Sequence, residues 1–356
     1  MSGPPVPTGA DDLVPAWLSA ALAPHAGGAR VTDVVSTRIG LGNVADSLRL
    51  ALTWDRPTAA PSSLVAKVPS SSETSRAAAA ATRTYELEAR FYNELAATVA
   101  VHRPHCYLSL HDPDTHAYTV LLEDLHPAEA GDQLAGCSAA EAASVMPELA
   151  ALHAPRWDDP RLVDLAWLDR PDRRAARASA ELIRMLWAGF LERYQARIEP
   201  DVLELGHVLM GRLTGYLADR PAPWTVVHGD FRLDNLLFGG PRVAVLDWQT
   251  VRLGPALSDV GYFIGSAFLP DDRRRHEEAL VRAYHDELTA RGVDLSWEDC
   301  WWQYRRYCLD GLVMGVAASM LVVRSERGDD LFVAMVNRHG AQAADLGADT
   351  LLGPPD

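Results

Sequence analysis

The stretch VVHGDFRLDN, residues 226–235, places one histidine, two aspartates and one asparagine directly after an apolar run. A second apolar run, VAVLDW at 243–248, leads to a further acid, Asp247. Both runs have the composition of short buried strands, so the polar side chains are expected near two strand ends. Aspartate and asparagine oxygens suit Mg²⁺, which binds one or two protein oxygens together with substrate phosphates. The two stretches therefore predict a site that contains metal ligands and a candidate base.

The composition indicates an ordinary globular protein with more than one core. The chain has 356 residues, which is long enough to predict two domains. It is 48% hydrophobic and 23% charged, and its formal net charge is −15. This acidic balance argues against nucleic acid or an anionic membrane surface as a partner.

Other sequence features point to a cytoplasmic location. The run GLVMGVAASMLVV, 311–323, is too short to span a bilayer and predicts a buried helix. The start of the chain has no basic segment followed by an apolar one, so no signal peptide is expected. The four cysteines form no CxxC pair, and neither a zinc site nor a disulfide framework is expected.

Lys67 is the only lysine of the chain. It lies near the end of a short β-like run, SSLVAKVPS at 62–70. A compact ammonium differs from the planar fork of an arginine. The residue is therefore either an accident of an arginine-rich composition or the mark of a site that arginine cannot fill.

The first 125 residues predict a small sheet with one long helix. The helix is expected over 82–100, where Leu87, Phe91, Leu95 and Val99 recur every four residues. About five strands are expected, at 30–39, 46–54, 62–68, 105–110 and 117–125, with a glycine turn, GLGN at 40–43, between the first two. From residue 126 the pattern is mainly helical, which predicts an N-lobe at 1–125 and a C-lobe at 126–356.

Together these parts describe phosphoryl transfer. Asp247 and Asn235 can hold Mg²⁺, and Asp230 can act as base. A lysine on a separate small sheet can bind nucleotide phosphates, and a carboxylate on the following helix can hold that lysine.

With these motifs in place, the chain resembles the aminoglycoside phosphotransferase and choline kinase-like superfamily of the protein-kinase-like fold. HGDFRLDN is similar to the HGDxxxxN catalytic loop of that family, LDW to its metal aspartate, LLEDL to its hinge and ELEARFYNEL to its lysine-pairing helix. The E-x-x-F-Y form of the helix looks most like the ecdysteroid-kinase-like subgroup. The resemblance covers about residues 30–270 and implies an α+β, bilobal fold with a β-rich N-lobe and a helical C-lobe.

The resemblance implies a role for each matching residue. Asp230 would accept the proton of the acceptor hydroxyl, while Asn235 and Asp247 would ligate Mg²⁺. Lys67 would hold the phosphates of ATP, and Glu88 would pair with it.

The remaining implied roles concern the nucleotide cover and the support of the loop. Gly40, Gly42 and Asn43 would cover the phosphates, although Ala45 stands where many family loops have a third glycine. Backbone groups of Glu123, Asp124 and Leu125 would face the adenine. His228 would brace the catalytic loop, and Asp259 resembles the structural aspartate that follows the metal strand.

Three other functions remain as alternatives. A catalytically inactive, kinase-like nucleotide-binding module predicts the loss of Lys67, Asp230 or Asp247, and none is lost. A protein kinase needs a longer activation segment than the 11 residues between Asp247 and Asp259. A metal hydrolase would not need Lys67.

The residues do not identify the acceptor. An antibiotic, sugar, nucleoside, sterol-like molecule or amino alcohol would supply the hydroxyl group, and an antibiotic-resistance role is one option. The tryptophan-rich segment 297–307 is expected in the core rather than on a substrate. His153 is expected as a satisfied core histidine. The oligomeric state is not predicted.

Overall fold

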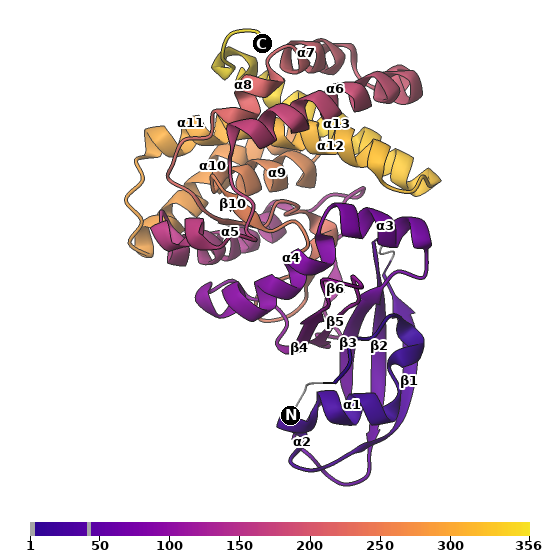
Figure 1. Cartoon of the computed structure of the whole chain (residues 1–356). Helices are drawn as coiled ribbons and strands as arrows, with labels where there is room; N and C mark the ends of the chain where they lie inside the picture. The colour runs from indigo at the N-terminus through magenta and orange to yellow at the C-terminus, as the bar shows by residue number, and fades with distance from the viewer. Residues whose placement is uncertain (1–3, 41–43) are drawn as a thin grey trace. The chain divides into compact units, whose positions relative to one another are not determined.

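The computed structural model describes residues 4–40 and 44–356 and divides into two compact units (Figure 1). Unit 1 comprises Met1–Ala97, Arg103–Pro127 and Leu246–Thr250, and unit 2 comprises Thr98–His102, Ala128–Val245 and Val251–Asp356. The described residues form no helix that is both long and apolar enough to cross a membrane.

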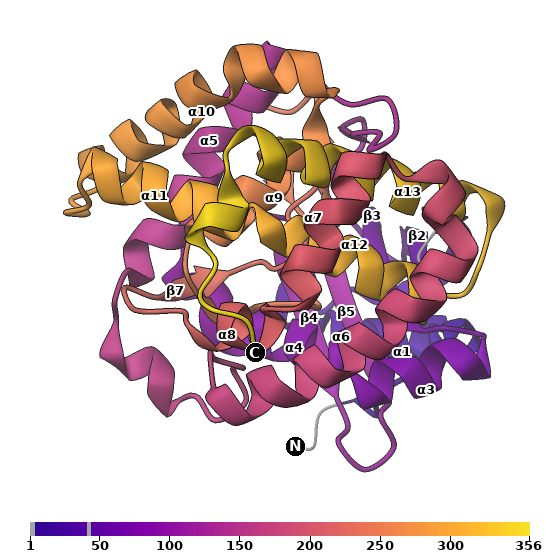
Figure 2. The ribbon, with the colours of Figure 1, turned by 90° about the horizontal axis from the view of Figure 1, so that it is seen from above.

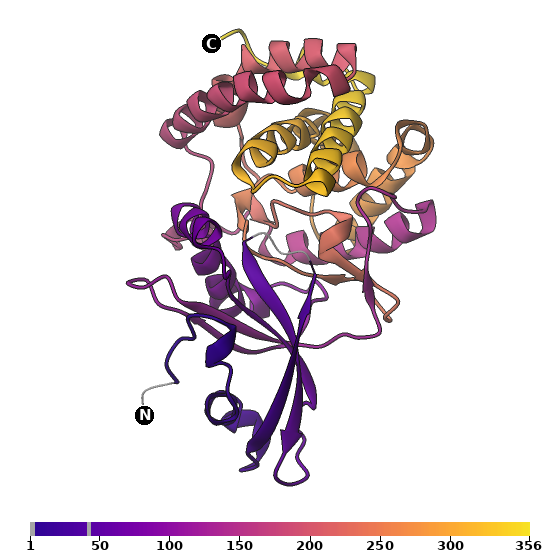
Figure 3. The same cartoon turned by 90° about the vertical axis from the view of Figure 1, so that its right-hand side faces the viewer.

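Unit 1 is built on one antiparallel sheet of five strands, which confirms the predicted β-rich part of the fold (Figure 3). The strand order is β1-β2-β3-β5-β4. The strands are β1 (Val31–Ile39), β2 (Ala45–Trp54), β3 (Ser63–Pro69), β4 (Cys106–His111) and β5 (Tyr118–Glu123). Two short helices, α1 (Pro15–Ala21) and α2 (Ala23–Ala26), precede the sheet.

The alternation of side chains in β3 separates a core face from a polar face. Ala66 and Val68 belong to the hydrophobic core, where they are buried together with Trp17 and Leu18 of α1. Successive side chains of a strand point to opposite faces. Lys67 therefore points away from this core.

The predicted helix over 82–100 is wrong in its extent. A separate helix, α3 (Glu73–Ala81), comes first, and α4 (Thr84–Arg90) begins only after Arg83. Arg83 has a φ of 58°, a left-handed conformation that ends any continuous right-handed helix. Past α4 the chain continues as a π-helical turn at Phe91–Leu95 and a 3₁₀ turn at Ala96–Thr98. The four-residue spacing of the apolar side chains indicates a helix, but it reveals neither the break at Arg83 nor the change from α-helix to π-helix after Arg90.

Unit 2 is mainly helical, as predicted (Figure 2). Its helices are α5 (Ala139–His153), α6 (Arg173–Tyr194), α7 (Pro200–Met210), α8 (Leu213–Ala218), α9 (Leu257–Ala267), α10 (Pro270–Ala290), α11 (Trp297–Tyr307), α12 (Leu309–Leu321) and α13 (Glu326–Asp345). Its short strands are β6 (Glu129–Ala130), β7 (Thr225–Val227), β8 (Leu236–Phe238), β9 (Ala244–Val245) and β10 (Arg252–Gly254). β7 pairs with β10, and β8 lies between β6 and β9.

Helix α9 is the centre of unit 2. All 11 of its residues are buried, and it packs against α5, α10, α11, α12 and α13. A helix that is buried on every side can fix polar side chains firmly in place. Two such side chains, Asp259 and Tyr262, contact the catalytic loop described below.

The contact between α12 and α13 requires a glycine. A Cβ atom on Gly311 would lie 2.1 Å from the ring of His339. That ring is buried and stacks on Tyr262, with 5.2 Å between the ring centroids. The ring cannot move without disturbing α9.

We therefore expect Gly311→Ala to lower the free energy of unfolding by about 1–3 kcal/mol, the usual cost of overpacking a core. Gly189→Ala in α6 is the matched control, because its Cβ would meet only the flexible end of Met320 at 2.8 Å. Removing a helical glycine there should be neutral or stabilise by up to about 1 kcal/mol. Urea unfolding of both variants measures the difference, and equal stabilities would refute this account of the contact.

Candidate active site

Unit 1 brings together three of the predicted site residues. The Nζ atom of Lys67 donates to Glu88 Oε1 at 2.7 Å and to Asp247 Oδ1 at 2.5 Å. The lysine side chain is only 11% exposed. Burial alone would lower the pKa of Lys67, but the carboxylates of Asp247 and Glu88 outweigh it and hold that pKa above its usual value. The lysine is therefore a buried cation held between two carboxylates.

Two tyrosines support Glu88: Tyr118 by a direct hydrogen bond, and Tyr85 by stacking on Tyr118. Tyr118 on β5 donates its hydroxyl to Glu88 Oε2, and the Tyr85 ring stacks on Tyr118 at a centroid distance of 4.8 Å. Burial and the charge of Glu88 raise the pKa of Tyr118 well above its usual value, so it stays a donor. The Tyr85 hydroxyl in turn donates to the backbone oxygen of Val44 at 2.6 Å. The chain just after the glycine turn is thus tied to the helix that carries Glu88.

Asp247 reaches Lys67 because its segment is anchored to unit 1. The Trp248 ring stacks on Phe91 at a centroid distance of 3.8 Å and an angle of 8°. Asp247 itself has a φ of 68°, which is uncommon for a residue with a side chain. Such conformations persist only when the surrounding structure enforces them. The stacking of Trp248 on Phe91 is the contact that can hold Asp247 in this conformation.

The predicted hinge residues, 123–125, differ in whether their backbone groups already form hydrogen bonds. The N–H of Glu123 already donates to the backbone oxygen of His105 at 2.8 Å. The side chain of Asp124 is held by Arg49 at 2.9 Å and by Ser63 at 2.5 Å. Within the described residues, Leu125 forms no backbone hydrogen bond. The backbone of Asp124 likewise forms no bond to another backbone group among the described residues, so Asp124 and Leu125 are both candidates for the predicted adenine contact. Gly40 has a φ of 70°, and Gly42 and Asn43 lie outside the described residues.

Unit 2 carries the catalytic loop, and Asp259 fixes where that loop begins. Asp259 accepts hydrogen bonds from the backbone N–H groups of His228 at 2.6 Å and Gly229 at 2.9 Å. Burial raises its pKa, but His153 and these donors outweigh burial and leave the pKa below its usual value. The His153 ring is fully buried between Asp259 and the hydroxyl of Tyr284. His153 thus supports the loop without facing a substrate.

Asp230 is held by donors on both carboxylate oxygens. Tyr262 of α9 donates to Oδ1 at 2.9 Å. Asn235 Nδ2 donates to Oδ2 at 3.0 Å, and Arg232 Nε donates to the same atom at 3.2 Å. His228 Nδ1 accepts from the backbone N–H of Asp230 at 3.2 Å. The orientation of this carboxylate is therefore set by three neighbours and its own backbone.

Sequence reasoning missed two of these neighbours, Tyr262 and Arg232. Tyr262 follows Asp259 by three residues, which puts both on one face of α9 and could have suggested a second contact with the loop. Arg232 lies within the motif itself, between Asp230 and Asp234, and it forms ion pairs with both. Burial lowers its pKa, but these acids outweigh burial and raise the pKa above the usual value.

The donor atoms fit a hard divalent cation. Because Asn235 Nδ2 faces Asp230, its Oδ1 atom points elsewhere and is available as a ligand. In unit 1, the carboxylate of Asp247 is a hard oxygen donor of the same kind. The described residues contain no cluster of three or more His, Cys, Asp or Glu side chains that could hold a metal ion. Mg²⁺ does not need such a cluster, since it keeps waters and substrate phosphates as ligands.

The fold and these residues define a phosphotransferase, and comparison with known proteins agrees. Residues 44–296 match the model of the phosphotransferase enzyme family, so the chain belongs to this family. Over 90 residues, 24% of the chain, it is 37% identical to acyl-CoA dehydrogenase family member 10 of Mus musculus. That match spans only 8% of the mouse protein.

Solved structures support the fold. A protein from Ralstonia eutropha assigned to the aminoglycoside phosphotransferases matches with a TM-score of 0.55 and 17% identity, covering 92% of this chain and 97% of that one. Choline kinase from Cryptosporidium parvum matches with a TM-score of 0.53 and 11% identity, covering 89% and 90%. The superfamily resemblance is thus confirmed, and the ecdysteroid-kinase-like subgroup stays a prediction.

The contacts of Asp230 generate a test of Tyr262. If Asp230 is the base that the sequence predicts, Tyr262→Phe is expected to lower kcat by at least about tenfold with an unchanged KM for the nucleotide, because that carboxylate loses one orienting donor. Tyr194→Phe is the control, since that hydroxyl donates to Asp329 and not to the loop. An unchanged kcat in Tyr262→Phe would show that the tyrosine only fills space.

Proposed function

We propose that the protein is an ATP- and Mg²⁺-dependent kinase that transfers the γ-phosphate to a hydroxyl group of a small molecule. The observation that carries the proposal is the placement of the only lysine, Lys67, between Glu88 and Asp247 in unit 1. A solvated strand end would not need two carboxylates around a buried ammonium. This arrangement suits phosphate binding by Lys67 with Asp247 as a metal ligand.

In the proposed reaction each side chain has one task. Lys67 binds phosphate oxygens, exchanging its bond with Asp247 for them, and Glu88 keeps the ammonium oriented. Asp247 and Asn235 would be the ligands of Mg²⁺, which would supply charge neutralisation on the nucleotide phosphates. Backbone groups of Asp124 and Leu125 would face the adenine.

Asp230 completes the step at the acceptor. The acceptor oxygen attacks the γ-phosphorus while the bond from that phosphorus to the β–γ bridging oxygen breaks. The hydroxyl proton passes to the Asp230 carboxylate, and ADP leaves. Tyr262, Asn235 and Arg232 hold the carboxylate during this transfer, so no reorientation is needed when the proton moves.

The acceptor is proposed only as a hydroxylated small molecule. Aminoglycosides appear in the names of structural relatives such as the gentamicin complex of a phosphotransferase, which matches with a TM-score of 0.51 and 14% identity. Such identity supports the fold and not the substrate. A panel of antibiotics, sugars, nucleosides, sterols and amino alcohols, assayed for Mg-ATP turnover, is the direct search.

The role of Asp230 is tested by Asp230→Asn on the best acceptor of that panel. The amide keeps the size of the side chain and cannot take the proton, so kcat should fall by about 10²–10⁴-fold. Nucleotide affinity should be unchanged, because the carboxylate faces the acceptor. A loss below about tenfold would make Asp230 structural. Nucleotide binding without turnover of any acceptor by the native protein would favour an inactive binding module.

Lys67 allows a second, independent test. Lys67→Arg should lose about 10²-fold in kcat, nearly as much as Lys67→Ala, because a longer, planar cation displaces the phosphates from the line of attack. Glu88→Ala should cost less, since the lysine keeps its charge and loses only its orientation.

Amine-directed labelling provides the control for this test. Only Lys67 and the N-terminal amine can react. Saturating Mg-ATP should protect Lys67 and leave the N-terminal amine reactive. A fully active Lys67→Arg variant, or labelling of Lys67 that ignores nucleotide, would reject the proposed site in unit 1.

A further inference from the structure

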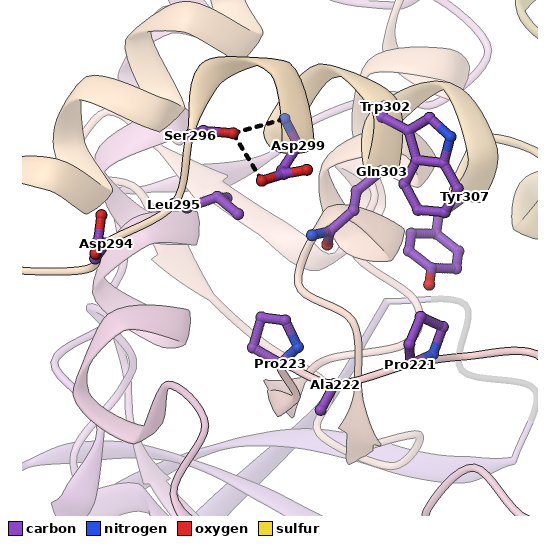
Figure 4. A pocket seen from close by; sticks show the side chains of 10 residues that line it. All are labelled: Pro221, Ala222, Pro223, Asp294, Leu295, Ser296, Asp299, Trp302, Gln303 and Tyr307. Atoms are coloured by element: carbon purple, nitrogen blue, oxygen red, sulfur yellow. Dashed lines mark hydrogen bonds between the residues drawn. The ribbon is translucent and has the colours of Figure 1, made fainter.

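A pocket in unit 2 lies outside the candidate active site (Figure 4). It has a volume of about 360 Å³ and lies where the turn before β7 faces the beginning of α11. Its size falls in the range of small-molecule sites. Its lining consists of Pro221, Ala222, Pro223, Asp294, Leu295, Ser296, Asp299, Trp302, Gln303 and Tyr307.

The pocket contains a buried polar side chain without a partner. Gln303 is 8% exposed, and its carboxamide forms no hydrogen bond with any described residue. Figure 4 shows this carboxamide directed from α11 into the pocket, towards Pro223. A carboxamide has two donor hydrogens and an acceptor oxygen, and those of Gln303 are open to the pocket and not sealed in the core. A ligand with a polar group at this point would satisfy them.

The charged residues that line the pocket, Asp294 and Asp299, are acidic, while two ion-paired arginines lie behind its rings: Arg306 is 5.8 Å from the Trp302 centroid and Arg220 is 5.3 Å from the Tyr307 centroid. Asp299 lies one turn before it on α11, and its Oδ2 atom accepts from the Ser296 hydroxyl at 2.7 Å. The other oxygen, Oδ1, accepts no hydrogen bond within the described part of the chain. Asp294 lies at the rim, and neither aspartate has an ion-pair partner among the described residues. Arg306, on the same helix, is already paired with Asp219 at 3.0 Å. The pocket therefore favours a positive ligand.

The other walls are apolar and aromatic. Trp302 is 40% exposed, so part of its indole surface is accessible from the solvent. Pro221, Pro223 and Leu295 supply further apolar surface. An indole face attracts both planar rings and cations. The walls thus fit a ligand with an aromatic or aliphatic body attached to its charge.

We propose that this pocket binds a small organic cation with an apolar or aromatic body and one hydrogen-bonding group. The ammonium group lies against Asp299, the body against Trp302 and the prolines, and the polar group pairs with Gln303. An anion would meet uncompensated carboxylates. A purely apolar ligand would leave Gln303 unsatisfied.

This site is distinct from the proposed acceptor position. None of the lining residues contacts Asp230, whose partners are Tyr262, Asn235 and Arg232. Residues 221–223 enter β7 at its first residue, while the catalytic loop leaves β7 at its other end. The pocket therefore defines a second ligand site, and its test requires neither ATP nor an acceptor.

The experiment compares two probes that differ only in charge. Tyramine carries an ammonium, an aromatic ring and a hydroxyl group, and tyrosol replaces the ammonium by a neutral hydroxyl. Calorimetric titration of the full chain should show saturable tyramine binding, at least about tenfold tighter than tyrosol, because the carboxylates favour the charged probe. Added salt should weaken tyramine binding.

Variants then locate the binding. Gln303→Met and Asp299→Asn should each weaken tyramine binding by about three- to tenfold. Gln303→Glu keeps the shape of the side chain, adds a negative charge, and should tighten it. Glu298→Gln is the matched control, since it lies beside Asp299 on α11 and does not line the pocket. Thermal unfolding of each variant verifies that it is folded.

Several results would overturn the proposal. One is the absence of saturable tyramine binding up to about 10 mM. Another is equal affinity for tyramine and tyrosol, which would indicate a neutral, polyhydroxylated ligand instead. A third is tyramine affinity that is unchanged in Gln303→Met, Gln303→Glu and Asp299→Asn alike, which would place the probe elsewhere.

Discussion

The contact on which unit 1 depends is a single buried ammonium between two carboxylates. Lys67 comes from the sheet, Glu88 from α4 and Asp247 from a segment more than 150 residues further along the chain. Removing either acid leaves a buried charge less compensated, and removing the lysine leaves two acids facing each other. The same three charges that join the parts of unit 1 are those that a nucleotide would use. The stability of unit 1 and the proposed phosphate binding therefore depend on the same cluster of three charged side chains.

Unit 2 meets a different structural requirement, which is to hold the carboxylate of Asp230 in place on an irregular loop. The solution is a helix buried on every side, whose Asp259 binds the first backbone amides of the loop and whose Tyr262 binds Asp230. The loop needs no regular structure of its own, because its beginning and its functional side chain both attach to α9. The contact between Gly311 and His339 extends this support to α12 and α13.

The sequence predicted those parts in which a local pattern determines the outcome. Strand alternation predicted the five-stranded sheet. The single lysine and the family resemblance pointed to Lys67, Glu88 and Asp247, which the structure brings together, while the catalytic and metal roles of Asp230, Asn235 and Asp247 stay predictions. The break at Arg83 was not predictable, because a left-handed backbone at arginine leaves no compositional trace. Tyr262 and the unpartnered Gln303 escaped for a related reason. The role of each depends on residues that are distant in the sequence, and a single sequence does not reveal which distant residues are neighbours in space.

The stacking of Trp248 on Phe91 has a consequence for modularity. It assigns Leu246–Thr250 to unit 1 although the chain on both sides belongs to unit 2, and Thr98–His102 makes the reverse excursion. Neither unit is therefore encoded by one uninterrupted stretch of gene. A fragment ending at Pro127 would lack Asp247 and would expose the face of Phe91 that Trp248 covers. Exchanging the first part of the gene for that of a relative would pair the lysine of one protein with the aspartate of the other.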